Sequence, residues 1–383
     1  MKILIAGGGI GGLACAALLK QRGFSPLLIE QAPEFKTIGY AIGLWEGGQN
    51  VLEQLGVLEK FVEKSHPVPR GGVADAHGNS IFDINFAEIL IGHRVSANIR
   101  RSDLHALLLE AAEGVDMRLG ITIKDILQNK DSVTVELNDG SRDTFDLLIA
   151  ADGMHSRIRE KVFGPRTLEY YGWAVYVAWI DGRNAAHPDI FPDKSQYYLR
   201  RDQGVLMIPL GDNTYVAGFL VRRKAGLSEQ PGARLVHIKT LFKGFCPVVE
   251  EAIMCIDESK GIFLDDLCHV KIREWYRGRV VLLGDSRHGV PPHTGLGASL
   301  ALQDALVLAE ELAKHTPILE TFARYAARRT PNVHYIQFVS KIFFHLIFIH
   351  GRILTFLREV ILPHIPKKLF LRFLIKKLVE MPV

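Results

Sequence analysis

Cysteine is scarce in this chain of 383 residues, and none of its spacings is one that metal or redox chemistry commonly uses. The four cysteines are Cys15, Cys246, Cys255 and Cys268, which form no CxxC pair and no zinc-binding pattern. His, Asp and Glu likewise form no group at metal-ligand spacing, so we expect no metal site. Scattered cysteines are typical of buried thiols in a reducing compartment, which favours a cytoplasmic protein without a disulfide framework.

Long apolar runs and repeats are also missing. The longest apolar stretch, near residues 342–349, contains His345 and follows Lys341, which disfavours a membrane-spanning helix. The apolar N-terminus leads into glycines with no cleavage site after it, so we interpret it as a strand rather than a signal peptide. A hydrophobic content of 48% with 23% charged residues predicts a globular protein, and the length allows two domains.

Charge of one sign is not in large excess, because the formal net charge is +4. Residues 332–383 contain eight Lys or Arg and two Glu, so the excess positive charge lies in this late segment. A main body without a basic excess is not expected to bind nucleic acid.

The most informative feature that is present is a GxGxxG motif between a short apolar strand and a small-residue helix. Gly7 permits a tight turn, Gly9 has no Cβ to block a pyrophosphate, and Gly12 lets the helix approach the strand. The helix N-terminus then offers N–H groups to phosphates. Glu30 ends the next strand, where it can accept both ribose hydroxyls and would repel a 2′-phosphate. The motif therefore predicts a site for FAD or NAD rather than NADP. The competing interpretation is that the glycines form only a structural turn.

Later segments differ from one another in composition and hydrophobic pattern. Apolar runs at 147–151 and 280–283 are typical of buried strands in a parallel sheet. Residues 168–268 instead contain short strands rich in Tyr, Trp and Val, separated by turns, as in an antiparallel sheet. We expect an α/β fold: a Rossmann-type domain with a parallel sheet, interrupted by an antiparallel β-sheet domain and followed by C-terminal helices.

Acidic residues follow both apolar runs, where ligands of such folds bind. Asp152-Gly153 follows the first run and Gly284-Asp285 the second. Asp285 is placed to accept a hydrogen bond from a ribitol hydroxyl. Residues 295–298 begin a helix whose N–H groups can face the pyrimidine edge of a flavin, where negative charge accumulates on reduction.

Taken in this order, the glycine motif, Arg101, the Asp152 segment and the 284–299 segment resemble the class A FAD-dependent monooxygenase family with the para-hydroxybenzoate hydroxylase fold. The resemblance covers residues 1–331. It implies a discontinuous FAD-binding domain (1–70, 96–166 and 269–331), a substrate-binding β-sheet domain (71–95 and 167–268) and a basic apolar C-terminal helical segment (332–383).

The resemblance also implies which residues contact FAD. The ADP half is expected at Gly7, Gly9, Gly11, Gly12, Glu30 and Gln31, with Ile123 near the adenine. The ribityl and phosphate region is expected at Arg101, Asp152, Gly153, Gly284 and Asp285, of which Asp152 and Gly153 also serve NAD(P)H. The isoalloxazine ring is expected at Ala41, Ile42, Gly43, Pro292, Gly295, Leu296, Gly297, Ala298 and Ser299. Three of these positions depart from the family's usual residues: Gln31 replaces Arg, Leu296 replaces Gln and Ser299 replaces Asn. Leu296 can therefore contact the ring through its backbone but not through a polar side chain.

The activity implied by the resemblance is monooxygenation. NADH or NADPH, bound transiently as a co-substrate without its own domain, reduces FAD. O2 then forms a C4a-hydroperoxyflavin that hydroxylates or epoxidises a small aromatic or lipophilic substrate. Two alternatives remain open: a flavin reductase or halogenase of the same fold, and a non-catalytic FAD- or ligand-binding protein.

The substrate side of the site is less defined, and the sequence identifies no catalytic base. The candidate pocket residues are Tyr171, Tyr176, Trp179, Tyr198 and His288. Aromatic residues are also ordinary components of strands, so each has a purely structural interpretation. The oligomeric state stays open.

The apolar and basic residues 336–383 have two interpretations. They form either a helical cap that packs on the body while its lysines reach water, or an interfacial anchor that makes peripheral membrane contact. Lys368, Arg372 and Lys376, four residues apart, would form a cationic stripe in either case. We favour the cap, because an apolar helix more often packs on its own protein.

Overall fold

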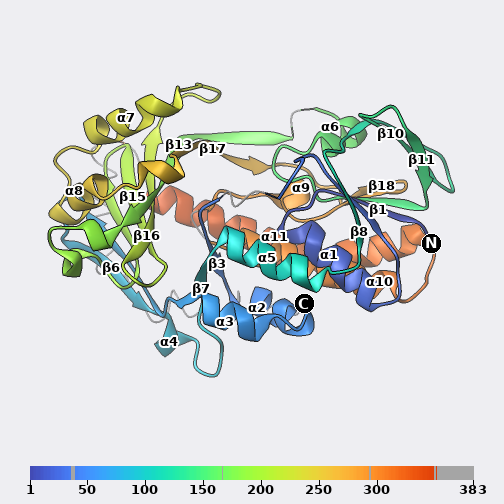
Figure 1. Ribbon diagram of the computed structural model, residues 1–383, viewed down its shortest axis with the longest axis horizontal. Helices are drawn as coiled ribbons and strands as arrows, with labels where there is room; N and C mark the ends of the chain where they lie inside the picture. Colours follow the sequence, from blue (N-terminus) through green and yellow to red (C-terminus); the bar gives the residue numbers. More distant parts are fainter. Residues whose placement is uncertain (36–38, 166, 293–294, 349–350, 352–383) are drawn as a thin grey trace.

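The computed structural model describes residues 1–35, 39–165, 167–292, 295–348 and 351, which form two bodies side by side (Figure 1). The first body contains a six-stranded sheet of order β18-β19-β12-β1-β2-β8. Its strands are β1 (Ile3–Ala6), β2 (Leu27–Glu30), β8 (Asp116–Leu119), β12 (Leu147–Ala150), β18 (Tyr276–Arg277) and β19 (Val280–Leu282). All neighbours are parallel except β18 and β19. Every residue of β1 and β12 is buried, which explains their uninterrupted apolar sequences.

Both faces of this parallel sheet are covered. Helices α1 (Ile10–Gln21), α5 (Arg101–Ala111) and α10 (Gly297–Leu312) share the main hydrophobic core with one face, and α2 (Glu46–Gln54) and α3 (Leu58–Lys64) extend that core. The other face packs against α6 (Arg157–Phe163) and a small sheet of β9 (Ile123–Gln128), β10 (Val133–Leu137) and β11 (Arg142–Phe145). A parallel sheet buried on both sides confirms the Rossmann-type arrangement.

A three-stranded sheet lies where the two bodies meet (Figure 1). It has the order β3-β7-β4, with β3 (Ala41–Leu44), β7 (Ala97–Arg100) and β4 (His66–Pro67). The antiparallel register pairs Ala41 with Arg100 and Gly43 with Asn98.

The second body is built on a seven-stranded sheet of order β17-β13-β16-β15-β14-β5-β6. Its strands are β5 (Arg70–Asp75), β6 (Ser80–Asn85), β13 (Leu168–Asp181), β14 (Ser195–Arg200), β15 (Gln203–Pro209), β16 (Thr214–Arg222) and β17 (Phe263–Val270), and the short helix α4 (Phe86–Ile89) follows β6. Only the pairing of β14 with β5 is parallel within this sheet. This confirms the antiparallel sheet expected between the two halves of the Rossmann-type body.

The two faces of this sheet have different neighbours. The outer face packs against α7 (Arg234–Leu241) and α8 (Pro247–Met254), forming a separate core. The inner face carries alternate residues such as Trp173, Val175, Val177 and Trp179, and it packs against Ala41 of β3. The inner face is therefore turned toward the Rossmann-type body.

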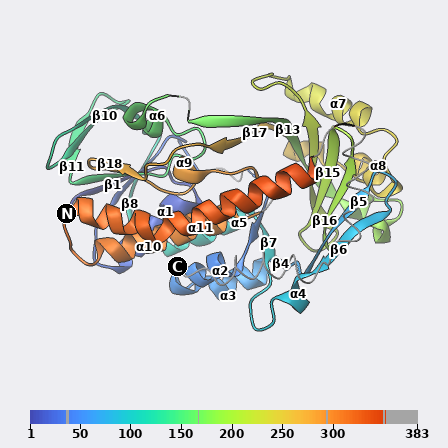
Figure 2. The same ribbon diagram turned by 180° about the vertical axis from the view of Figure 1, so that it is seen from behind.

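A single helix, α11 (Ile318–Ile347), runs along the first body and reaches the second (Figure 2). This helix continues past Pro331 without a break. Phe344, Ile347 and Phe348 are buried against the inner face, so this end of the chain is a cap on the protein as far as residue 348. Residues 352–383, including the cationic stripe, lie outside the described residues. Among the described helices, none combines the length and apolarity needed to cross a membrane.

Candidate cofactor and active site

The glycine loop has the geometry of a phosphate cradle. Gly7 has φ +113°, and a Cβ there would clash with the Ala151 carbonyl. A Cβ on Gly12 would lie 3.1 Å from the carbonyl carbon of Gly7 and overlap its oxygen. Among the described residues, no heavy atom beyond the chain neighbours of Gly9 lies within 4 Å of its Cβ position, and none of their side chains caps α1 there. Gly7 and Gly12 therefore serve the fold, whereas Gly9 leaves space in front of unpaired helix N–H groups.

Glu30 is held rigidly at the end of β2. Its two carboxylate oxygens accept the backbone N–H groups of Gly8 at 2.7 Å and Ala32 at 2.8 Å. Each oxygen keeps a further lone pair, which suits a diol ligand. Gln31 is exposed beside it, while Ile123 is half-buried in the core beneath the small sheet.

The residues expected around the flavin converge from four segments. A Cβ on Gly39 would touch the Arg101 side chain at 2.8 Å. Positions Gly43 and Gly295 face each other, since a Cβ on Gly43 would lie 3.8 Å from the Gly295 carbonyl oxygen. A Cβ on Gly297 would lie 3.7 Å from the Asp285 carboxylate. β3, the start of α5, the start of α9 (Asp285–His288) and the start of α10 therefore surround one region.

Further contacts tie that region together. The Ser299 hydroxyl accepts the Trp45 N–H at 3.0 Å, which fixes the start of α10 against the end of β3. Ala41 and Ile42 lie on β3, Leu296 is buried, and Pro292 precedes α10. Sequence reasoning therefore grouped residues that the fold brings close, although they come from distant parts of the chain.

Two carboxylates in this region are desolvated without being fully enclosed. Asp285 has an exposed surface, yet burial raises the pKa of its carboxyl. Burial also raises the pKa of Asp152, whose Oδ1 atom is buried with no partner among the described residues. Surface exposure combined with desolvation marks side chains that line a recess. An unpaired buried acceptor and a carboxylate in a recess fit the hydroxyl-rich middle of FAD.

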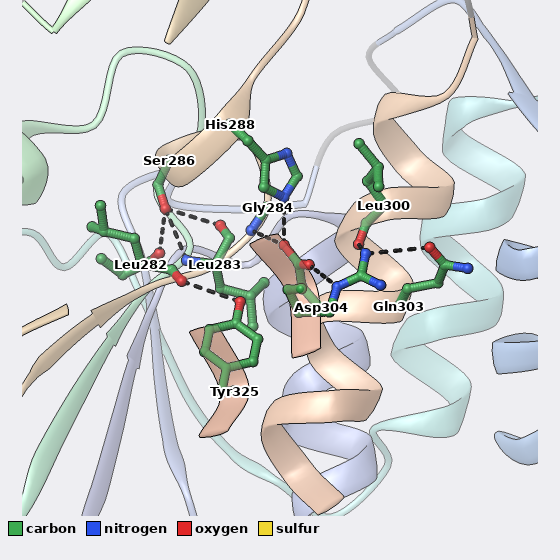
Figure 3. Close-up of polar contacts among 11 residues, drawn as sticks. Leu282, Leu283, Gly284, Ser286, His288, Leu300, Gln303, Asp304 and Tyr325 are labelled. Carbon is green, nitrogen blue, oxygen red and sulfur yellow. Dashed lines mark hydrogen bonds and ion pairs between the residues drawn. The ribbon is translucent and has the colours of Figure 1, made fainter. Parts of the chain in front are cut away.

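His288 does not belong to a substrate pocket, contrary to the expectation. Its ring is completely buried, and its Nε2 atom donates to Asp304 Oδ2 at 2.5 Å (Figure 3). Asp304 also accepts the Gly284 N–H at 3.0 Å and Arg329 Nε at 2.6 Å. Burial by itself raises the pKa of Asp304, but His288 and Arg329 outweigh it and lower that pKa to about 2.

This cluster of Asp304, His288 and Arg329 positions the Gly284-Asp285 turn. Ser286 adds a second restraint, because its hydroxyl donates to the Ala150 carbonyl at 2.6 Å. Nothing in the spacing of His288 and Asp304 along the sequence indicated their pairing.

Strand alternation separates the four aromatic candidates. Tyr171 and Trp179 belong to the inner face, where Tyr171 stacks on Phe344 at 4.4 Å between ring centroids. Tyr176 and Tyr198 point to the outer face and are buried against α7 and α8, so they cannot line a pocket on the cofactor side. Trp179 donates its Nε1–H to the Gly39 carbonyl at 3.3 Å, which joins the sheet to the loop before β3.

Sequence reasoning missed three residues of the recess: Tyr40, His155 and Asp265. Burial raises the pKa of Tyr40, and the charges of Asp265 and Asp285 raise it further while Arg101 opposes them. Tyr40, Asp265, Asp285 and Arg101 therefore lie near one another, although they come from both bodies. The sequence does contain one indication of this site: Asp265 is a charged residue between Phe263 and Leu267 on one face of a strand.

Comparison with known proteins identifies the family. The family described as FAD binding domain matches residues 1–334. The FAD-dependent urate hydroxylase of Klebsiella pneumoniae is 30% identical over 341 residues, covering 87% of each chain. The 6-hydroxynicotinate 3-monooxygenase of Pseudomonas fluorescens is 27% identical over 350 residues, covering 88% of this chain and 90% of that enzyme.

Solved structures agree with these sequence matches. Klebsiella pneumoniae HpxO, crystallised with FAD and uric acid, superposes with a TM-score of 0.88 at 25% identity, covering 100% of this chain and 97% of HpxO. A single-residue variant of HpxO in complex with FAD superposes with a TM-score of 0.89 at 25% identity, covering 100% of this chain and 99% of the variant. The chain therefore belongs to the FAD-binding class A flavoprotein monooxygenases with the para-hydroxybenzoate hydroxylase fold.

Proposed function

We propose that this flavoprotein uses NAD(P)H and O2 to hydroxylate or epoxidise a small aromatic or lipophilic substrate. The observation that carries the proposal is the approach of the predicted cofactor residues to the apolar inner face. Ala41 and Tyr40 pack in that core, and the charges of Arg101 and Asp285 act on Tyr40. FAD, when bound, supplies the reduction by nicotinamide and the activation of O2. The remaining work falls to the protein, which must hold the cofactor, exclude water and orient the substrate.

Cofactor binding is assigned to two groups of residues. Gly9, the free N-terminus of α1 and Glu30 would hold the ADP half, with the helix dipole facing the phosphates. Asp152, Asp285 and Arg101 would bind the ribityl chain. The backbone at the start of α10 would face the ring, where N–H groups stabilise negative charge.

Water exclusion is assigned to the inner face. Trp173, Val177, Leu199 and Val216 are buried there, so the wall opposite the cofactor residues offers few partners for water. A dry wall suits an apolar substrate and protects a reactive oxygen species from hydrolysis. By contrast, the relatives named for urate or 6-hydroxynicotinate act on polar heteroaromatic compounds.

The test starts from purified protein reconstituted with FAD. NADH and NADPH oxidation are measured with and without a panel of phenols and apolar aromatics, under 18O2, and products are analysed by mass. One 18O atom incorporated per product supports the proposal. Product that gains two hydrogens instead identifies a reductase. Substrate binding without any nicotinamide oxidation across the panel identifies a binding protein.

Two matched variants complete the test, one at a predicted cofactor contact and one away from the site. Asp285→Asn keeps the size of the side chain but weakens the acceptor, so it is expected to lower FAD affinity and substrate-stimulated oxidation together. Asp139→Asn, in an exposed turn of the small sheet, is expected to leave both unchanged.

A further inference from the structure

The inner face can be followed as rows of residues in register across the sheet. One row runs through Phe263, Val177, Gly218, Leu206, Tyr197 and Val73. The next row runs through Asp265, Val175, Leu220, Gly204, Leu199 and Asp75. The two charged side chains of these rows stand at opposite ends of the second row. Asp75 is held in the turn after β5, where its Oδ1 atom accepts the backbone N–H groups of His77 and Asn79. Asp265 instead pairs with the apolar Val175 from the edge strand β17. A carboxylate in such surroundings costs stability unless it serves another purpose.

Asp265 lies at the end of its row that is nearest to the cofactor residues. Its strand neighbours on the same face are Phe263 and Leu267, which pack in the inner-face core. Phe263 meets the Tyr40 ring edge-on, with centroids 6.3 Å apart. The charges of Asp265, Asp285 and Arg101 all act on Tyr40, so Asp265 lies near the predicted flavin residues.

The surroundings of Asp265 leave its carboxylate available. Its surface is exposed, yet burial raises its pKa, as at Asp285. His155, from the loop after β12, opposes this shift, and Asp266 on the same strand adds to it. The titratable groups that interact with it are His155, Asp266, Tyr40 and Cys268, and the Asp266 backbone N–H also donates to it. Asp266 points to the opposite face, where its Oδ2 atom accepts the Gly226 N–H at 2.7 Å.

We propose that Asp265 selects the substrate, by accepting a hydrogen bond from an O–H or N–H group of a neutral, otherwise apolar molecule. The inference rests on the proposed function and adds its substrate class. The inner face binds the apolar part, while Asp265 receives the donor at the edge nearest the cofactor residues. Because a ligand carboxylate would place two like charges in one desolvated recess, carboxylated substrates are rejected.

The experiment compares three probes that share one ring: para-cyanophenol, its methyl ether para-cyanoanisole, and para-cyanobenzoate. Their dissociation constants for the FAD-loaded protein are measured by calorimetry at a pH where the phenol stays neutral. Wild-type protein is expected to bind the phenol about tenfold more tightly than the ether, as for a hydrogen bond to a charged acceptor. The benzoate is expected to bind most weakly.

Asp265→Asn retains the shape and removes the charge. It is expected to reduce the preference for the phenol severalfold and to strengthen binding of the benzoate. Asp266→Asn, the matched change on the other face, is expected to preserve the wild-type order of the three probes. The melting temperature and FAD content of each variant verify that the site is intact.

The inference is overturned if wild-type protein does not prefer the phenol, if Asp265→Asn keeps the wild-type ratios, or if Asp266→Asn changes them equally. Failure of the proposed function has a separate signature. Protein that discriminates the probes through Asp265 but transfers no oxygen to any substrate would retain this binding role and refute monooxygenation.

Discussion

Two glycines of one motif are expected to fail in different ways when each is replaced by alanine. At Gly9 the φ angle of −78° is accessible to alanine, and no heavy atom lies within 4 Å of the new Cβ. At Gly12 the new Cβ would lie 3.1 Å from the Gly7 carbonyl carbon and 3.3 Å from the Ala151 Cβ. It would also overlap the Gly7 carbonyl oxygen. Gly9→Ala should therefore damage cofactor binding alone, whereas Gly12→Ala should damage the fold.

The magnitudes follow from these environments. Forcing an extra carbon into a packed site costs about 1–3 kcal/mol, and Gly12→Ala is expected at the upper end because its obstacle is backbone. In a chain of 383 residues the unfolding entropy is about 0.8 kcal/mol/K, so each kcal/mol lowers Tm by about 1 °C. Gly9→Ala is expected to leave Tm unchanged or raise it slightly, because alanine restricts the unfolded chain by about 0.4–1 kcal/mol. Its methyl group would occupy the space assigned to the pyrophosphate, so FAD affinity should fall at least about tenfold, or 1.4 kcal/mol.

The assay uses protein stripped of FAD. Thermal unfolding is followed by circular dichroism, and FAD is then titrated while its fluorescence quenching is recorded. A Gly9→Ala protein that binds FAD as tightly as wild type would show that the pyrophosphate does not pass this residue. A Gly12→Ala protein with unchanged Tm would refute the close packing of α1 on the glycine loop.

Three further outcomes are expected. Asp304→Asn leaves Arg329 and His288 without their buried carboxylate, so unfolding free energy in urea should fall by about 3–5 kcal/mol, and an unchanged midpoint would contradict this role. Because the pKa of Asp304 is lowered to about 2 from 3.8, its contribution is present above about pH 4 and should be lost as pH falls toward 2; acid unfolding of wild type and Asp304→Asn should converge there. Phe344→Ala removes a buried ring stacked on Tyr171 and should cost about 3–5 kcal/mol, whereas exposed Phe338→Ala should cost little in the same urea titration.

Local signals in the sequence predicted the Rossmann-type half well. The motif at Gly7, Gly9 and Gly12 works through backbone geometry within one strand–loop–helix unit, so it can be recognised without knowing the rest of the fold. The apolar runs that became β12 and β19 were identifiable because strands covered on both sides have no polar face.

The substrate side could not be predicted equally well, for a related physical reason. Residues 173–180 of β13 are all buried, so both faces of this strand are apolar and alternation carries no information about which face meets the cofactor. Tyr176 and Tyr198 were therefore indistinguishable from Trp179 before the positions of α7 and α8 were known. His288 presents the same difficulty, because its partner Asp304 lies on another helix and only the tertiary structure pairs them.

Helix α11 connects these two halves of the site. In its first half Arg329 binds Asp304, which also holds the Gly284-Asp285 turn on the cofactor side. Near its end Phe344 and Phe348 pack on Tyr171 and Trp173 of the inner face. Because α11 is continuous from Ile318 to Ile347 and contacts both walls, it constrains the spacing of the recess more than short loops between the bodies can. The C-terminal cap is therefore part of the architecture that sets the distance between the cofactor residues and Asp265, rather than an appendage to it.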